Sequence, residues 1–417
     1  MTKDIIILQK RELDQKLKEL YVPREAKFKE IKSNLIKVVI GPRRAGKSSF
    51  SIHCLSKLSE FGYVNFDDEK LVDVADYNEI INAVDSVYNN PKYLLLDEIQ
   101  NLAKWELFVN RLQRQGYNLI ITGSNSNLLS SELSTHLTGR YSSALIFTFS
   151  FKEFVKYGGK ELTEVETKER LNSYLELGGY PEPLVKNLNY KEYLSTLLDS
   201  IIYKDIIKRH KIRSAQGIED LSSYLISNIA KDYSYNTLIQ VTKCKSVHTV
   251  EKYLKYLEES FVLFKLNRFS FKVKEQINSP KKIYCFDNGF INAKAFKISR
   301  DIGRIYENTV AIELKKREMA GGAKVFYWKN REQQEVDFVV KKNAKIGQLI
   351  QVCYNLDDLA VQKREIRALI LASKELKCGN LLVITNDYEI EKDEEWFGIK
   401  RKIKFIPLWK WLLEAIK

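Results

Sequence analysis

The sequence predicts an α/β protein of several domains, and three observations support this fold class. The chain has 417 residues, more than one ordinary domain holds. Apolar runs typical of buried strands alternate with helical patterns over residues 1–150, as in a parallel sheet whose two faces are covered by helices. A glycine-rich loop also separates the first of these strands from the helix that follows it.

This loop has the spacing of a phosphate-binding loop. Four residues separate Gly41 from Gly46, and Lys47 and Ser48 follow at once, which gives the pattern G-x-x-x-x-G-K-[ST]. Such a loop turns backbone N–H groups toward phosphate oxygens at the start of a helix. We expect Lys47 to reach the β and γ phosphates of ATP, and Ser48 to bind Mg²⁺. The predicted nucleotide-binding residues are Gly41, Pro42, Arg43, Arg44, Ala45, Gly46, Lys47, Ser48 and Ser49.

Two acids follow the buried strand predicted at 93–96. Parallel sheets place their ligands at the carboxyl ends of strands, and Asp97 and Glu98 occupy such an end. We expect Asp97 to hold Mg²⁺ and its waters, and Glu98 to orient the attacking water. The alternative is a solvated strand end, but the position of the pair after the phosphate-binding loop favours hydrolysis.

The next strands offer further candidates. Ser124 or Asn125 follows the strand predicted at 117–122 and could contact the γ-phosphate or the water. Arg140 precedes the strand predicted at 143–149 and could supply positive charge to the transition state, in cis or from a neighbouring subunit. A surface arginine beside a turn glycine is the competing interpretation of Arg140.

The other elements of residues 1–150 follow from hydrophobic periodicity. A helix over 4–20 would use Ile7, Leu13, Leu17 and Leu20 as its apolar positions. The remaining predictions are helices at 48–58, around Ile80 and Val84, and at 105–115, with a strand at 63–66.

Residues 151–213 are predicted to be a helical region, and 214–300 a winged helix. Helices at 221–230, 237–241 and 247–259 precede a β-rich stretch at 261–271. Ser246 would cap the third helix. DNA contact by this helix and a role as a rigid interdomain element both remain open. The residues expected on its exposed side are His248, Thr249, Lys252 and Lys255.

Charge and cysteine content bear on partners and compartment. The formal charge of +14 indicates a polyanionic partner, first of all DNA, although a lysine-rich, heat-adapted surface would look the same. The five cysteines are scattered in apolar surroundings, as in a reducing cytosol. With no signal peptide or spanning helix predicted, we expect a soluble, cytoplasmic protein that does not enter a membrane.

Several motifs together resemble the archaeal ATPase family of AAA+-like proteins. That family joins a P-loop ATPase domain to a winged helix and a nuclease-like domain. The resemblance implies that the Gly41 and Asp97 strands flank the Thr122 strand, that Ser124 and Asn125 form a sensor, and that Arg140 is a finger candidate. The motifs lie at 41–48, 96–100, 121–126, 137–141, 150–154, 178–183, 282–289 and 306–308.

The resemblance also implies a PD-(D/E)XK, restriction-endonuclease-like α/β fold for residues 301–417. A helix at 305–318 would carry Glu307 or Glu313, and strands at 335–340 and 348–352 would carry Asp337 and Gln351 as metal ligands. Cys353 stands where such a nuclease needs lysine, so nuclease activity is doubtful. Further strands are predicted at 324–328 and 381–384, and a strand and helix at 403–416.

Two functions remain open at this stage. One is a DNA-associated, Mg²⁺-dependent ATPase whose nucleotide state moves the winged-helix and nuclease-like domains, alone or as a homo-oligomer. The other is a nucleotide-dependent switch that acts on a protein partner, with an inactive nuclease-like domain. The predicted domains are 1–150, 151–213, 214–300 and 301–417.

Overall fold

The chain folds into two compact units in the computed structural model. Unit 1 comprises Met1–Phe149, Tyr180–Asn187 and Glu259–Phe261, and unit 2 the remainder. The structure describes residues 2–28, 30–124, 137, 139–159, 161–244, 246–294, 301–356 and 358–414.

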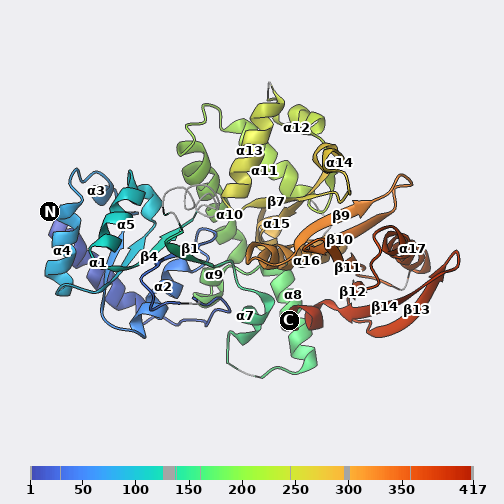
Figure 1. Ribbon diagram of the computed structural model, residues 1–417, viewed down its shortest axis with the longest axis horizontal. Helices are drawn as coiled ribbons and strands as arrows, with labels where there is room; N and C mark the ends of the chain where they lie inside the picture. The colour runs from blue at the N-terminus through green and yellow to red at the C-terminus, as the bar shows by residue number, and fades with distance from the viewer. Residues whose placement is uncertain are drawn as a thin grey trace. The chain divides into compact units, whose positions relative to one another are not determined.

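Unit 1 is built on a five-stranded parallel sheet (Figure 1). Its strand order is β2-β3-β4-β1-β5, so β4 lies between β3 and β1 as the resemblance implies. The carboxyl ends of β1, β3 and β4 therefore meet at one edge of the sheet. The strands are β1 (Ile36–Ile40), β2 (Phe61–Asn65), β3 (Tyr93–Asp97), β4 (Asn118–Gly123) and β5 (Tyr141–Leu145).

Helices cover this sheet because its central strands are apolar on both faces. All five residues of β1 are buried, and Val39 packs in one core with Phe50, Tyr63, Leu95 and Ile120. The helices of this unit are α1 (Thr2–Lys16), α2 (Lys47–Ser56), α3 (Glu69–Val72), α4 (Asn78–Tyr88), α5 (Trp105–Arg114) and α9 (Pro181–Val185).

The first helix is shorter than predicted and buries a different face. Helix α1 ends at Lys16, and Leu20, beyond its end, is 67% exposed. Its buried apolar residues are Ile5, Ile6 and Leu13. The prediction that the helix extends to residue 20 was wrong, and Leu17 and Leu20 lie beyond its end and are exposed.

Unit 2 begins with helices whose starts are encoded locally. Ser150 and Thr163 each form a capping box with the glutamate three residues later, which satisfies the free N–H groups of the first turn. A π-helical stretch at Ile201–Lys208 was not predicted. The helices are α7 (Phe151–Lys156), α8 (Glu164–Leu177) and α10 (Tyr190–Ser200).

A small antiparallel sheet of order β6-β8-β7 follows within unit 2. The β-rich stretch predicted at 261–271 contains the strand β7, whose partner β8 comes only after the short helix α14. The elements are α11 (Gln216–Ser227), β6 (Asp232–Tyr233), α12 (Tyr235–Thr242), α13 (Val247–Glu259), β7 (Leu263–Asn267), α14 (Val273–Asn278), β8 (Lys281–Cys285) and α15 (Asn288–Lys294).

The last part of the chain forms a six-stranded mixed sheet of order β13-β14-β12-β11-β10-β9. Strand β13 was not predicted, because its charged residues alternate with few apolar ones. In the described part of the chain, no helix is long and apolar enough to span a bilayer. The elements are α16 (Ile302–Met319), β9 (Lys324–Lys329), β10 (Glu335–Lys342), β11 (Lys345–Val352), α17 (Leu359–Glu375), β12 (Leu381–Thr385), β13 (Ile390–Trp396), β14 (Ile399–Pro407) and α18 (Leu408–Leu413).

Candidate functional site

The loop between β1 and α2 has the backbone of a phosphate cradle. Arg44 and Gly46 adopt left-handed conformations, with φ of 61° and 91°, so the chain curls before α2 begins at Lys47. Gly41 is required by close approach, since a Cβ there would lie 1.7 Å from the Ile146 carbonyl oxygen. The loop therefore presents the amino end of α2 to a ligand.

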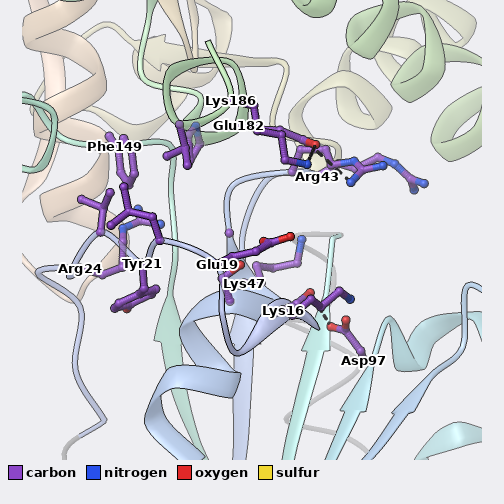
Figure 2. Close-up of a pocket in the computed structure, with 18 of the residues that line it drawn as sticks. Lys16, Glu19, Tyr21, Arg24, Arg43, Lys47, Asp97, Phe149, Glu182 and Lys186 are labelled. Atoms are coloured by element: carbon purple, nitrogen blue, oxygen red, sulfur yellow. Dashed lines mark hydrogen bonds and ion pairs between the residues drawn. The ribbon is translucent and has the colours of Figure 1, made fainter. Parts of the chain in front are cut away.

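A cavity of about 380 Å³ opens in front of this loop. Figure 2 shows Lys47 near its centre, with Tyr21 and Arg24 to one side. Above it lie Glu182 from α9 and Lys186, which directly follows that helix. The cavity is lined by six of the predicted loop residues: Arg43, Arg44, Gly46, Lys47, Ser48 and Ser49. The other three, Gly41, Pro42 and Ala45, are buried and do not line it. Other lining residues include Lys16, Asn65, Asp67, Asp97, Glu98, Phe149 and Pro181.

Asp97 lies beside the loop at the end of β3. Its Oδ1 accepts a hydrogen bond of 2.9 Å from the Ser48 hydroxyl and another of 2.5 Å from the Thr122 hydroxyl. Burial, and then the neighbouring charge of Glu98, raise the pKa of Asp97, and these two hydrogen bonds only partly offset the rise. The pair Ser48 and Asp97 thus offers two hard oxygen atoms at the mouth of the loop.

Glu98 faces the loop lysine. Its Oε1 lies 3.6 Å from Lys47 Nζ, and its backbone is left-handed with φ of 51°. Burial alone would raise the pKa of Glu98, but Lys47 foremost, then Gln100 and Arg43, hold it below its usual value. Glu98 is therefore a carboxylate, in a strained conformation of the kind found at functional sites.

Three residues that support these acids were not predicted. Thr122 accepts a hydrogen bond of 3.0 Å from the Glu98 N–H while donating to Asp97, so one side chain fixes both acids. The Tyr63 hydroxyl donates to Asp97 Oδ2 at 3.2 Å. Gln100 donates both to Glu98 and, at 3.4 Å, to Ser124. A polar residue within an apolar strand, as at Thr122, is the sequence signal that could have revealed one of them.

The side-chain oxygen atoms of Ser48 and Asp97 fit Mg²⁺ that is bound together with a nucleotide. Magnesium prefers oxygen ligands and takes few from the protein, leaving the rest to phosphates and waters. Ser48 and Asp97 supply one hydroxyl and one carboxylate, already hydrogen-bonded to one another. Across the described ranges, no group of three or more His, Cys, Asp or Glu side chains is placed to hold a metal by itself, without a nucleotide.

Comparisons with known proteins agree with this geometry. Residues 33–155 match the family described as an AAA domain. Residues 168–301 and 302–411 match two families described as domains of unknown function, DUF8612 and DUF4143.

Two curated relatives extend over most of the chain. An uncharacterized protein of Methanocaldococcus jannaschii is 37% identical, covering 98% of this chain and 94% of its own length. An uncharacterized protein of Haemophilus influenzae is 30% identical, covering 82% of this chain and 87% of its own. The chain belongs to the family of these two relatives. Because one relative is archaeal and the other bacterial, the family extends beyond archaea.

Among solved structures, this chain is similar to a Walker-type ATPase of Pyrococcus abyssi. The two are 13% identical, the match covers 68% of this chain and 95% of the other, and the TM-score is 0.41.

The remaining candidates of the ATPase site lie apart from the pocket or outside the described residues. Ser124 is buried at the end of β4, next to Gln100. Asn125 lies outside the described residues. Arg140 precedes β5, and its carbonyl oxygen accepts from the Ile36 N–H at the start of β1. Since the loop follows the opposite end of β1, Arg140 is a strand length of about 16 Å from it within one chain.

The C-terminal candidates come together in unit 2. Glu307, Asp337 and Gln351 line one cavity of about 810 Å³. Glu313 instead pairs with Arg317 at 2.9 Å. Cys353 is buried, and its thiol contacts the Asn355 carbonyl oxygen. Lys282 was not predicted, yet its ammonium contacts both Glu307 and Asp337.

Proposed function

We propose that this protein is a P-loop ATPase, which binds ATP with Mg²⁺ in unit 1 and hydrolyses it. The observation that carries the proposal is the junction of two pairs in one pocket: Ser48 with Asp97 at 2.9 Å, and Lys47 with Glu98 at 3.6 Å. A phosphate ligand, a metal ligand pair and a base are the parts that phosphoryl transfer to water requires.

Each side chain has a defined task in this proposal. The backbone of Arg44 to Ser48 and the amino end of α2 hold the phosphates, and Lys47 neutralises the β and γ oxygens. Ser48 and Asp97 would hold Mg²⁺, which supplies charge neutralisation at the phosphates when bound.

Glu98 accepts a proton from, and orients, the water that attacks the γ-phosphate. Gln100 and Thr122 hold its side chain and backbone in place. Asn125 as a sensor, and Arg140 acting from a neighbouring subunit of a homo-oligomer, remain predictions. Arg140 lies at the amino ends of the strands, and the phosphate-binding loop lies at their carboxyl ends. This position favours a role in trans over one in cis.

ATP turnover with and without Mg²⁺ tests the proposal. Lys47→Ala should lose nucleotide binding, whereas Lys57→Ala, which removes an exposed lysine just after the same helix, should behave as wild type. Equal turnover in Lys47→Ala and wild type would contradict the proposed site.

We further propose that unit 2 contains a winged helix that associates with DNA. The order α11, β6, α12, α13, β7 and β8 supports the fold. Ser246 caps α13 by accepting from the Thr249 N–H, and His248, Lys252 and Lys255 on this helix are exposed. These side chains, together with the formal charge of +14 on the whole chain, favour contact with phosphates.

DNA binding measured at increasing salt tests this second proposal. Lys252→Ala/Lys255→Ala should weaken binding and reduce its salt dependence, because two phosphate contacts are lost. The matched control, Lys57→Ala/Lys92→Ala, removes two exposed lysines from unit 1. If wild type does not bind duplex, branched or single-stranded DNA at low salt, the proposal fails.

A protein partner is the second candidate, and one surface favours it. Phe271, Val273 and Ile277, in and beside α14, are 73%, 68% and 64% exposed. Contiguous exposed apolar side chains mark protein interaction sites. Partners that exchange with nucleotide state, without any effect of DNA, would support a switch in place of a DNA-associated ATPase.

For residues 301–414 we propose a nuclease-like fold. The order α16, β9, β10, β11, α17, β12 supports it, because it places Glu307 on the first helix and Asp337 and Gln351 on successive strands. Whether nucleotide state moves this domain together with the winged helix is part of the same proposal.

A further inference from the structure

The side chain of Lys282 lies within the carboxylates that a nuclease would use for metal. Its Nζ is 2.9 Å from Glu307 Oε1, 2.5 Å from Glu335 Oε1 and 3.4 Å from Asp337 Oδ1. The lysine comes from β8, whereas the acids come from α16 and β10. Only 4% of its side chain is exposed, so the ammonium depends on these carboxylates for its solvation.

The other polar atoms of this cluster also have internal partners. Tyr284 donates to Glu307 at 2.7 Å, and the Val352 N–H donates to Asp337 Oδ2 at 2.9 Å. Gln351 donates to Glu365 at 2.6 Å and accepts from the Asp337 N–H. Glu307, Asp337 and Gln351 thus all have hydrogen-bond partners within the protein.

The electrostatics agree with a lysine in place of a metal. Three carboxyl groups, those of Glu307, Glu335 and Asp337, lie within 3.4 Å of the Lys282 ammonium. A divalent cation between Glu307 and Asp337 would meet a fixed positive charge at about ion-pair distance, and no three-acid metal group exists in the described part of the chain.

We propose that the Lys282 ammonium is the resident cation of this cluster, so that the nuclease-like domain works without a divalent metal and does not cleave nucleic acid. The position of Cys353, where a nuclease needs lysine, does not contradict this. The lysine of the cluster comes from another sheet and neutralises the acids.

The same contact gives the domain a mechanical role. Lys282 fastens β8 to α16 and β10, and two further bonds join these sheets: Phe269 N–H to the Tyr327 oxygen, and Tyr327 hydroxyl to the Pro280 oxygen, each at 2.6 Å. The strand pair β7–β8 is therefore joined to the six-stranded sheet by hydrogen bonds and by the Lys282 ion pairs. The winged helix and the nuclease-like domain would move as one body.

Mn²⁺ binding to the full-length, nucleotide-free protein tests this inference. Electron paramagnetic resonance should show the same amount of bound Mn²⁺ in wild type and in Asp337→Asn. Lys282→Met keeps the length of the side chain without its charge and should gain such a site, which Lys282→Met/Asp337→Asn should lose again. Mn²⁺ should also raise the Tm of Lys282→Met by more than it raises that of wild type, and Asp337→Asn should remove this difference.

Three results would overturn the inference. One is an Asp337-dependent Mn²⁺ site in wild type, another is Asp337-dependent cleavage of DNA by wild type, and the third is a folded Lys282→Met without a new site. If Lys282→Met does not fold, the wild-type and Asp337→Asn titrations still decide. The inference does not depend on ATP hydrolysis, because Mn²⁺ bound beside Ser48 and Asp97 would be insensitive to Asp337→Asn.

Discussion

Lys47 Nζ lies 3.6 Å from the Glu98 carboxylate and donates a hydrogen bond of 3.0 Å to the Pro42 carbonyl oxygen. Phosphate oxygens of a nucleotide would therefore compete with the Glu98 carboxylate for the Lys47 ammonium.

This relationship predicts the behaviour of Glu98→Gln. The variant should bind ATP at least as tightly as wild type, because Lys47 no longer leaves an ion pair to reach phosphate. Its turnover should fall by about 10²- to 10⁴-fold, the usual contribution of a general base. Fluorescent-nucleotide binding and single-turnover hydrolysis measure the two effects, and Glu60→Gln, an exposed acid of the same unit, is the control. Unchanged turnover would remove Glu98 from this role.

A second prediction concerns Thr122. Thr122→Val keeps the shape of the side chain but deletes the hydroxyl that holds both Asp97 and Glu98. We expect turnover to fall roughly tenfold to a hundredfold, as for other residues that orient ligands, with little loss of stability from packing. Thr122→Ser keeps the hydroxyl and should retain most activity. Equal losses in both variants would indicate a packing effect.

Arg24 provides a third prediction, on stability. It donates to the Ala45 carbonyl oxygen at 2.8 Å and lies over the Phe149 ring, so it ties the loop to the chain after β5. Arg24→Met should lower the free energy of unfolding by about 1–3 kcal/mol, because a carbonyl group loses its partner. Urea unfolding measures this change, and nucleotide affinity should fall with it. The free energy of unfolding of Arg24→Lys should lie between those of wild type and Arg24→Met. If Arg24→Met is as stable as wild type, Arg24 does not stabilise the loop in this way.

The fourth prediction concerns pH and His210. The ring stacks on Tyr256 with centroids 3.6 Å apart, and burial, then Arg209 and Lys255, lower its pKa. The unfolded chain, with a histidine pKa of about 6.5, therefore takes up a proton before the folded protein does. Stability should fall as the pH drops below about 6.5.

His210→Phe keeps the stack but cannot titrate, so its Tm should change less with pH than that of wild type. Tm measured at neutral and mildly acidic pH for both proteins tests this. If acidification lowers both Tm values equally, His210 does not contribute to the pH dependence.

The sequence was most informative where function depends on neighbouring residues. The spacing of Gly41, Gly46 and Lys47 predicts a local backbone, and Asp97 follows an apolar run whose burial is evident from composition. Their meeting at one edge follows from the parallel sheet, since the carboxyl ends of its strands coincide.

Contacts between distant segments could not be predicted in the same way. Thr122 is 25 residues from Asp97, and Lys282 is 55 residues from Asp337. Their pairing depends on strand order in one case and on the packing of two sheets in the other. The end of α1 at Lys16 was also missed, because the apolar spacing continues through Leu17 and Leu20 after the helix has stopped.

The composition of unit 1 has a practical consequence for dissecting this protein. Tyr180–Asn187 belongs to unit 1 although the chain on either side of it belongs to unit 2. Pro181, Glu182, Val185 and Lys186 in that segment line the nucleotide cavity. A fragment that ends at residue 150 would carry the whole phosphate-binding loop and yet lack one wall of its cavity. Recombinant fragments of unit 1 would therefore need to extend at least to Asn187, and proteolysis near Tyr180–Asn187 should impair nucleotide binding without cutting the loop.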